Sequence, residues 1–292
     1  MVKPALSAVL FNDRESVLAL EAISGAGFGA VELVANGPYS GVDTAQARRA
    51  TKQGLSRLGL VASALHAPYS SFKMDLARLD EGYRRQGVAT VIKALGWAAE
   101  LEAATVVVHL TQSHSESPKV GLSGMGRTVE AAYRSLAELV PAAEKFGVRI
   151  AVENVPDMRP ELERIGRPII EMRELRTFLA GFPPQWVGLC LDTGHAVLNG
   201  LDPIREARIA GDRLIATHLQ DSTGLGEDSH LLPGNGIIDW KGVIRALVGI
   251  GYSGYWTFEL TEKGPDSLRR AIAASASRIA SQWSLEMAEG ER

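Results

Sequence analysis

Histidines and carboxylates recur along this 292-residue chain at the ends of short apolar runs. The segment LCLDTGHA, residues 189–196, places Asp192 and His195 three residues apart directly after such a run. Buried carboxylates repel one another and are costly to desolvate unless a cation neutralises them. Imidazole and carboxylate together suit divalent Mn²⁺, Zn²⁺, Co²⁺ or Mg²⁺. The residue types therefore predict a metal site, provided that the fold brings them together.

Eight short β-rich segments alternate with helical patterns and would position these residues. Several are nearly continuous apolar runs, typical of parallel strands covered by helices. The predicted strands are 5–11, 29–35, 61–67, 105–110, 149–155, 187–193, 214–220 and 255–261. The helical patterns are 14–27, 44–59, 80–102, 126–147, 168–182, 202–211, 239–251 and 265–287.

Eight such units predict an α/β fold, a single (β/α)₈ TIM barrel that spans residues 1–292, with a frayed tail from about residue 286. The alternative is an open, doubly wound sheet. That alternative is disfavoured because no glycine-rich phosphate loop follows the first predicted strand. The segment GAGFGA, 25–30, follows a helix and precedes a strand, so we expect its glycines to form a turn.

In such a barrel, the carboxyl ends of the strands form one rim, where active sites are found. The candidate ligands fall at the ends of the third to eighth predicted strands: His66, His109, Glu153, Asp192 with His195, His218 and Glu259. Taken singly, each has a structural interpretation; Asp192, for example, could cap a following helix. Six successive strands that end in ligand types favour a shared site instead. We predict that Asp192 is a metal ligand and that His195 approaches from the following turn.

Four further histidines and carboxylates lie outside this set of strand-end residues. Asp228 and His230 lie in a polar loop on the same rim, and in extended backbone their side chains would point the same way. We predict a functional role for both. Glu32 lies within a predicted strand. Its pattern fits equally a structural role and a role in which it supports a metal ligand. His114 has no place in the set.

Composition limits the possible partners. The chain has 31 basic and 34 acidic residues, a formal charge of −3, so there is no overall electrostatic case for nucleic acid or an anionic membrane. No run approaches the roughly 20 apolar residues that span a bilayer, and the N-terminus does not read as a signal peptide. A cytoplasmic location is expected by default. The single cysteine, Cys190, fits a buried core position and argues against a thiolate-rich zinc site.

The chain resembles the xylose isomerase-like TIM barrels. That superfamily includes sugar phosphate isomerases and epimerases and the endonuclease IV type of apurinic endonuclease. The segments that carry the resemblance are LHAPY (65–69), VVVHL (106–110), AVEN (151–154), LCLDTGHA (189–196), THLQDS (217–222), DSHLLPGNGIIDW (228–240) and FEL (258–260).

The resemblance implies one of two sites. In the epimerase branch, one divalent ion is held by the residues that match Glu153, Asp192, His218 and Glu259, and His195 contacts the substrate. In the endonuclease branch, three zinc ions use those four residues and five more. The additional matches, as metal or substrate ligands, are His66, His109, His195, Asp228 and His230.

Three departures weigh against the endonuclease. The segment after Asn154 reads VPDMRP and lacks a glycine-rich run, the interval from His218 to Asp228 is short, and the chain is slightly acidic. Gripping a duplex needs a concentrated basic face. Against the epimerase, the stretch LQDSTG lacks the arginine that some ketose epimerases carry there. We expect a small-molecule sugar as partner rather than nucleic acid or a membrane, and a homo-oligomer stays open.

The resulting hypothesis is a divalent-metal-dependent sugar or sugar phosphate isomerase or epimerase of carbohydrate metabolism. Glu153 or Glu259 would remove a proton next to a carbonyl, giving a metal-stabilised enediolate, and the other would return one. His195 would hydrogen-bond the developing oxyanion. The alternatives are an endonuclease IV-like multinuclear zinc phosphodiesterase acting on abasic DNA, and a keto-polyol dehydratase that uses the same enolising chemistry.

Overall fold

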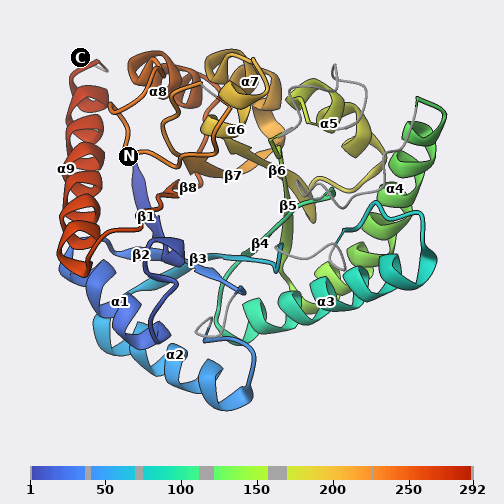
Figure 1. The fold of residues 1–292 in the computed structure, drawn as a ribbon, viewed down its shortest axis with the longest axis horizontal. Coiled ribbons are helices and arrows are strands. Elements are labelled where there is room, and N and C mark those ends of the chain that lie inside the picture. Colours follow the sequence, from blue (N-terminus) through green and yellow to red (C-terminus); the bar gives the residue numbers. More distant parts are fainter. Residues whose placement is uncertain are drawn as a thin grey trace.

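The computed structural model describes residues 2–36, 41–69, 75–111, 122–156, 170–224 and 226–290. Eight parallel strands close into a barrel in which each strand pairs with its neighbours in sequence and the first pairs with the last (Figure 1). The strands are β1 (Lys3–Ser7), β2 (Ala30–Val34), β3 (Val61–His66), β4 (Thr105–Val108), β5 (Arg149–Glu153), β6 (Val187–Asp192), β7 (Leu214–Leu219) and β8 (Tyr255–Phe258). His114 lies outside the described residues.

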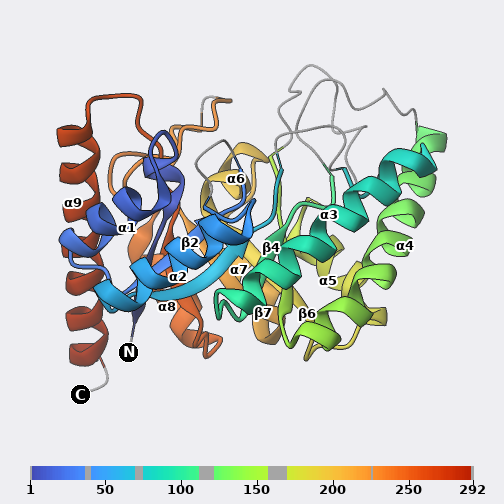
Figure 2. The ribbon, with the colours of Figure 1, turned by 90° about the horizontal axis from the view of Figure 1, so that it is seen from below.

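Helices surround the barrel, with α9 on one side and the neighbouring pair α3 and α4 on the other (Figure 2). They are α1 (Ser16–Gly25), α2 (Ala45–Leu58), α3 (Glu81–Glu100), α4 (Leu122–Phe146), α5 (Met172–Phe178), α6 (Thr193–Leu198), α7 (Pro203–Ala210), α8 (Trp240–Gly249) and α9 (Asp266–Gly290). Among the described residues there are three short 3₁₀ helices, η1 (Ala8–Phe11), η3 (Leu179–Gly181) and η4 (Gly211–Arg213). None of the described helices is long and apolar enough to cross a membrane.

The TIM-barrel prediction is confirmed, and a strand lies within each of the eight predicted segments except the first. Strand β1 begins and ends earlier than predicted, at Lys3 and Ser7, and residues 8–11 form the 3₁₀ helix η1. The side chain of Ser7 accepts a hydrogen bond from the backbone N–H of Val9 and so caps that turn. The apolar run continues because Val9, Leu10 and Phe11 are buried in the helix rather than in the sheet.

Two further boundaries differ from the sequence prediction. The segment after Asp192, expected to be a turn, is the short helix α6. Helix α9 continues to Gly290, through the start of the tail that we expected to be frayed. The glycines that follow α2 and α4, Gly59 and Gly147, have positive φ values of 64° and 66°, as a helix C-cap requires.

The middle of the barrel is filled by small side chains. Ala64, Val107, Ala151, Cys190 and Ala216 form a buried cluster separate from the larger core between strands and helices. Side chains alternate along a strand, so the residue two positions later points to the same side. For these five the later residues are His66, His109, Glu153, Asp192 and His218. The strand pattern therefore places ligand types in one layer, at the carboxyl ends of the strands.

Candidate active site and metal centre

The structure brings all nine predicted site residues to the carboxyl end of the barrel. Glu153, Asp192, His66 and His218 lie at the ends of their strands, and His109 and Glu259 follow β4 and β8 directly. The remaining three come from helix α6 and from the loop between β7 and α8: His195, Asp228 and His230. Their roles as ligands or catalysts remain predictions.

Three groups of these residues could each hold a cation, because in each group one ligand atom per residue lies within 4.8 Å of the others. The first group is Glu153, Asp192, His218 and Glu259; the second is His66, Glu153 and His218; the third is His195, Asp228 and His230. Glu153 belongs to two of them, and its Oε2 also lies 3.0 Å from Nε2 of His109. The geometry therefore offers one complete four-residue site and a possible extension on either side.

Four of the histidines are oriented by a fixed acceptor on one ring nitrogen. Three use Nδ1: His66 on the Ala67 carbonyl at 2.8 Å, His195 on the Asn154 carbonyl at 2.9 Å, and His230 on the Glu259 carbonyl at 3.0 Å. The fourth, His218, uses Nε2 on the Glu32 carboxylate at 2.9 Å. Carbonyl and carboxylate oxygens only accept hydrogen bonds, so these nitrogens carry the hydrogen. Metal-binding histidines are usually held in this way.

The opposite ring nitrogens face carboxylate oxygens. His218 Nδ1 lies 3.1 Å from Glu153 Oε1 and 3.4 Å from Glu259 Oε2. Both His218 Nδ1 and Glu153 Oε1 are buried and have no hydrogen-bond partner. A ring lone pair that faces a carboxylate at this distance needs a proton or a cation between them. The donor set and its unpaired buried atoms therefore fit a divalent cation.

Asp192 is held on several sides. Its side chain accepts a hydrogen bond from the backbone N–H of His195 at 2.7 Å and so caps α6, and Gln220 Nε2 donates to both of its carboxylate oxygens. Its backbone exchanges two hydrogen bonds with the Asn154 amide. A Cβ at Gly194 would clash with the Gln220 side chain, so the Asp-Thr-Gly-His segment needs its glycine. The capping role and the candidate ligand role thus belong to the same residue.

The loop after β7 is organised by the buried carboxylate of Asp221. It accepts hydrogen bonds from the backbone N–H of Gly234 and from Trp240 Nε1, both at 2.8 Å. The loop presents Asp228 and His230 with Nε2 of the histidine 3.3 Å from Oδ1 of the aspartate. The backbone at His230 is not extended as we supposed, since its φ is +44°. The two side chains meet because the loop is folded around Asp221.

The two glutamates differ in their electrostatic surroundings. Burial opposes ionisation of Glu153, but His218 and His109 outweigh it and hold its pKa well below the ordinary value. Burial raises the pKa of Glu259 to about 7, and His218 and His230 only partly offset this effect. Carboxyl groups with separated pKa values can act as base and acid in one reaction.

Four supporting residues were not recognised as such from the sequence: Glu32, which was left open, and Asn154, Gln220 and Asp221. Glu32 is 1% exposed and contacts His218 directly, which supports a role behind the ligands. A carboxylate inside an otherwise apolar strand, AVELV, was the available signal. Asn154 and Gln220 carry no comparable signal in the sequence, because their side-chain amides form hydrogen bonds with a residue far away in the chain, Asp192.

A family model described as "Xylose isomerase-like TIM barrel" matches residues 20–281. The chain belongs to this family. Among solved structures, a D-tagatose 3-epimerase-like protein superposes with a TM-score of 0.82 at 23% identity, and the match covers 100% of both chains. That likeness is one of fold.

Sequence relatives of this xylose isomerase-like barrel include proteins of different description. An uncharacterised protein of Methanocaldococcus jannaschii is 27% identical over 201 residues, which are 68% of this chain and 64% of the relative. A mannonate dehydratase of Chromohalobacter salexigens is 28% identical over 199 residues, 63% of this chain and 47% of the enzyme. The chain thus spans about half to two thirds of the length of these two relatives.

Proposed function

We propose that this protein is a divalent-metal-dependent isomerase or epimerase of a small sugar or sugar phosphate, which moves a proton on a carbon next to a carbonyl. The observation that carries the proposal is the convergence of Glu153 and Glu259 with Asp192 and His218 in one buried group. The fold shared with a D-tagatose 3-epimerase-like protein over the whole chain supports a ketose as the substrate class.

The four residues Glu153, Asp192, His218 and Glu259 would hold the cation. Three carboxylates and one imidazole suit a divalent ion such as Mn²⁺, Co²⁺, Zn²⁺ or Mg²⁺. When bound, such an ion supplies Lewis-acid polarisation of a substrate carbonyl and so makes the neighbouring C–H more acidic.

The two glutamates would carry the proton. Glu153 has the lowered pKa and is ionised at neutral pH, so it is favoured as the group that accepts the proton. Glu259, in the same buried group, is placed to supply the proton that returns to carbon. Return of the proton to the opposite face of the same carbon gives epimerisation, and return to the neighbouring carbon gives isomerisation.

His195 would bind the substrate oxygen. Its Nδ1 donates to the Asn154 carbonyl, which fixes the ring, and Nε2 lies 3.4 Å from Oδ2 of Asp228. Burial opposes protonation of this ring, but Asp192 and Asp228 outweigh it and hold its pKa well above the ordinary value. A protonated Nε2 can donate a hydrogen bond to an oxygen on which negative charge develops.

The test is proton exchange in D₂O on a panel of free and phosphorylated ketoses, followed by NMR, with the protein loaded with Mn²⁺ or Co²⁺. We expect one C–H next to the carbonyl of one sugar to be replaced by C–D. Glu153→Gln and Glu259→Gln should each lower the rate by at least about 100-fold, because each removes a proton-transfer group. Glu286→Gln, an exposed glutamate on α9, is the matched control and should retain the rate. Full exchange in either site variant would overturn the mechanism.

A second candidate is metal-assisted phosphodiester hydrolysis. The specific observation that favours it is the pair of additional groups beside the four-residue site, one around His66 and one formed by His195, Asp228 and His230. Clustered cations can generate a hydroxide and stabilise both oxygens of an in-line displacement. Cleavage of a duplex that carries one abasic site, by protein loaded with Zn²⁺, would support this candidate. Intact duplex at full zinc loading would exclude that substrate.

A dehydratase is a variant of the first proposal, favoured by the similarity to a mannonate dehydratase. It would begin with the same proton abstraction and continue with loss of a β-hydroxyl. Mass analysis of the D₂O reactions separates the two outcomes, because dehydration lowers the mass of the product by one water and epimerisation does not.

A further inference from the structure

A cavity of about 540 Å³ opens at the amino ends of the strands, the opposite end of the barrel from the carboxylate cluster. Its wall includes the first residues of four strands, Thr105, Arg149, Leu214 and Tyr255. It reaches up to Ala64 and Ala216, which belong to the layer of small side chains inside the barrel. Barrel interiors are usually filled by bulky branched residues, so this layer of small side chains leaves room beneath it.

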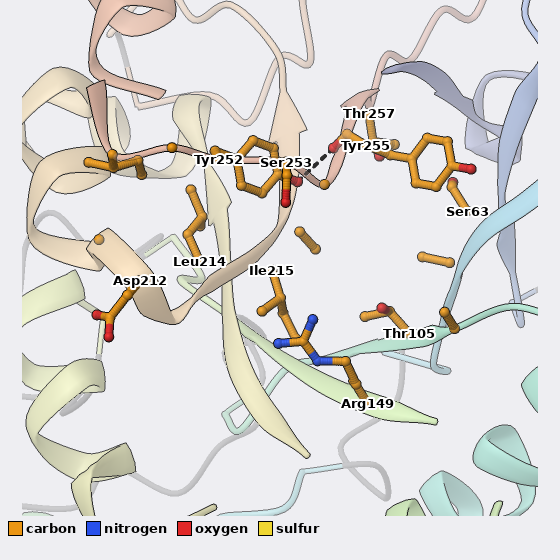
Figure 3. Close-up of a pocket in the computed structure, with 17 residues that line it drawn as sticks. Ser63, Thr105, Arg149, Asp212, Leu214, Ile215, Tyr252, Ser253, Tyr255 and Thr257 are labelled. Atoms are coloured by element: carbon orange, nitrogen blue, oxygen red, sulfur yellow. Dashed lines mark hydrogen bonds between the residues drawn. The ribbon is translucent and has the colours of Figure 1, made fainter. Parts of the chain in front are cut away.

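Arg149 is the cation of this cavity. Figure 3 shows its guanidinium directed into the space between β4 and β7. Its Nε is buried and has no hydrogen-bond partner, and no carboxylate among the described residues pairs with it. Burial lowers the pKa of the guanidinium, and no carboxylate counters that effect. A partly buried charge without a counter-ion is costly, and a bound anion would remove that cost.

One hydroxyl group stands beside this cation, and another lies across the cavity from it (Figure 3). Thr105 is the register partner of Arg149 on the neighbouring strand. Ser63 is 6% exposed, lines the cavity, and its Oγ has no hydrogen-bond partner. A guanidinium with free donors recognises carboxylate or phosphate oxygens, and the buried hydroxyl across the cavity can bind a polar group elsewhere on the same ligand.

The rest of the cavity wall agrees with an anionic ligand. Lys3 Nζ donates to the Ser253 carbonyl at the cavity, which adds a second cation nearby. Among the described residues of the wall, the one carboxylate is that of Asp212, which is exposed and already paired with Arg176 at 2.6 Å. Figure 3 shows Asp212 on the other side of Leu214 from Arg149.

We infer that this cavity binds a small organic anion, with a carboxylate or phosphate group held by Arg149. The volume is that of a small-molecule site and exceeds what a bare phosphate fills. Ile215, Leu214 and Tyr252 supply apolar wall for the organic part of the ligand. The site stands at the opposite end of the barrel from the proposed reaction and does not depend on it.

The test is calorimetric titration of the full metal-loaded chain in anion-poor buffer, with inorganic phosphate and acetate as separate probes. We expect at least one probe to bind to the wild type. Arg149→Met should raise its Kd at least about tenfold, because it removes donors to a charged group. The probe that binds more tightly identifies the anionic group. Arg208→Met, which replaces an exposed arginine on α7, is the matched control and should leave the Kd unchanged.

The cation content of Arg149→Met shows whether the candidate metal site at the carboxyl end of the barrel is intact. We expect this content to equal that of the wild type. Equal binding by Arg149→Met and wild type would overturn the inference, because the anion would then bind elsewhere, for instance at the metal. No binding of either probe to the wild type would overturn it too. Should Arg149→Met fail to fold, wild-type crystals soaked in phosphate decide: density beside Arg149 supports the site, and its absence overturns it.

Discussion

Glu32 fixes the ring of His218 from within the barrel, through a hydrogen bond from Nε2 of the histidine at 2.9 Å. Carboxylates behind a metal-binding histidine orient the ring and make it a better ligand. We therefore expect Glu32→Gln to weaken binding of Mn²⁺ or Co²⁺ by roughly 10- to 100-fold. Competition with a chelating dye measures that affinity.

The control for this variant is Glu286→Gln, which should bind the cation like the wild type. An unchanged affinity in Glu32→Gln, with His218→Ala clearly weakened, would show that Glu32 does not support the ligand.

If Glu259 is a ligand, as proposed, it should make cation binding depend on pH. Burial raises its pKa to about 7, so below that pH the folded, cation-free protein holds a proton that the cation must displace. Burial opposes protonation of His218, another candidate ligand, but nearby acidic groups such as Glu259 and Glu32 outweigh it and hold its pKa well above the ordinary value, so a second proton must leave. The apparent affinity should therefore rise at least about tenfold per pH unit between roughly pH 5 and pH 7 and continue to rise above pH 7. Titrations at several pH values measure this slope. A flat profile over that range would contradict the assignment of Glu259 as a ligand.

The candidate ligands could be recognised from the sequence because each one follows an apolar strand, and the barrel rim collects strand ends. Residues that act on the ligands are harder to recognise. Gln220 and Asn154 directly follow strands β7 and β5 and form hydrogen bonds with Asp192, which is 28 and 38 residues away in the sequence. Only the folded barrel shows which segments become neighbours.

At the scale of the element, helix α6 depends on a carboxylate that is also a candidate metal ligand. Asparagine keeps the N-cap acceptor but loses the charge, whereas alanine loses both. In the metal-free protein, the free energy of unfolding of Asp192→Ala should be about 1–2 kcal/mol lower than that of Asp192→Asn. Alanine loses both the N-cap hydrogen bond and the hydrogen bond from Gln220. Urea unfolding followed by circular dichroism measures the difference.

Both Asp192 variants should bind the cation more weakly than the wild type. If the two variants unfold at the same urea concentration, the capping bond from His195 does not contribute to stability. If Asp192→Asn binds the cation like the wild type, Asp192 is not a ligand.

Where a helix or strand begins and ends depends on local contacts, which the hydrophobic pattern of the sequence does not reveal. Residues 8–11 read as strand because they are apolar, yet the Ser7 cap turns them into a 3₁₀ helix. Helix α6 is only six residues long, too short for a helical period to be visible. The long helices and their glycine C-caps were predictable because their periodicity extends over several turns.

At the scale of the whole molecule, cation binding should contribute to the stability of the barrel. The buried carboxylates repel one another without it, and only the folded chain brings the ligands together. At a cation concentration about 100-fold above Kd, the expected gain is about 2.7 kcal/mol, or roughly 5–10 °C in Tm for a chain of this size. Calorimetric scans with and without a chelator measure the shift. The prediction would be contradicted if a chelator left the Tm of the wild type unchanged, or if it lowered the Tm of Asp192→Asn as much as that of the wild type.

The barrel itself was predictable because eight strand patterns alternate with eight helical patterns, and few folds accommodate that order. The inner layers were not predictable in the same way. Which face of each strand points inward became clear only from the register, and with it the cavity at the amino end beneath Ala64 and Ala216. The two ends of the barrel thus carry opposite electrostatic character, carboxylates at one end and Arg149 at the other.

Elemental analysis of the gently purified, dialysed chain tests the central claim most directly. The account predicts at least one equivalent of a divalent cation per chain, and a loss of that equivalent in Asp192→Asn. One equivalent matches the four-residue site, and two to three equivalents of zinc would match all three ligand groups. A chain that stays free of Mn²⁺, Co²⁺, Zn²⁺ and Mg²⁺ even after loading would contradict the account.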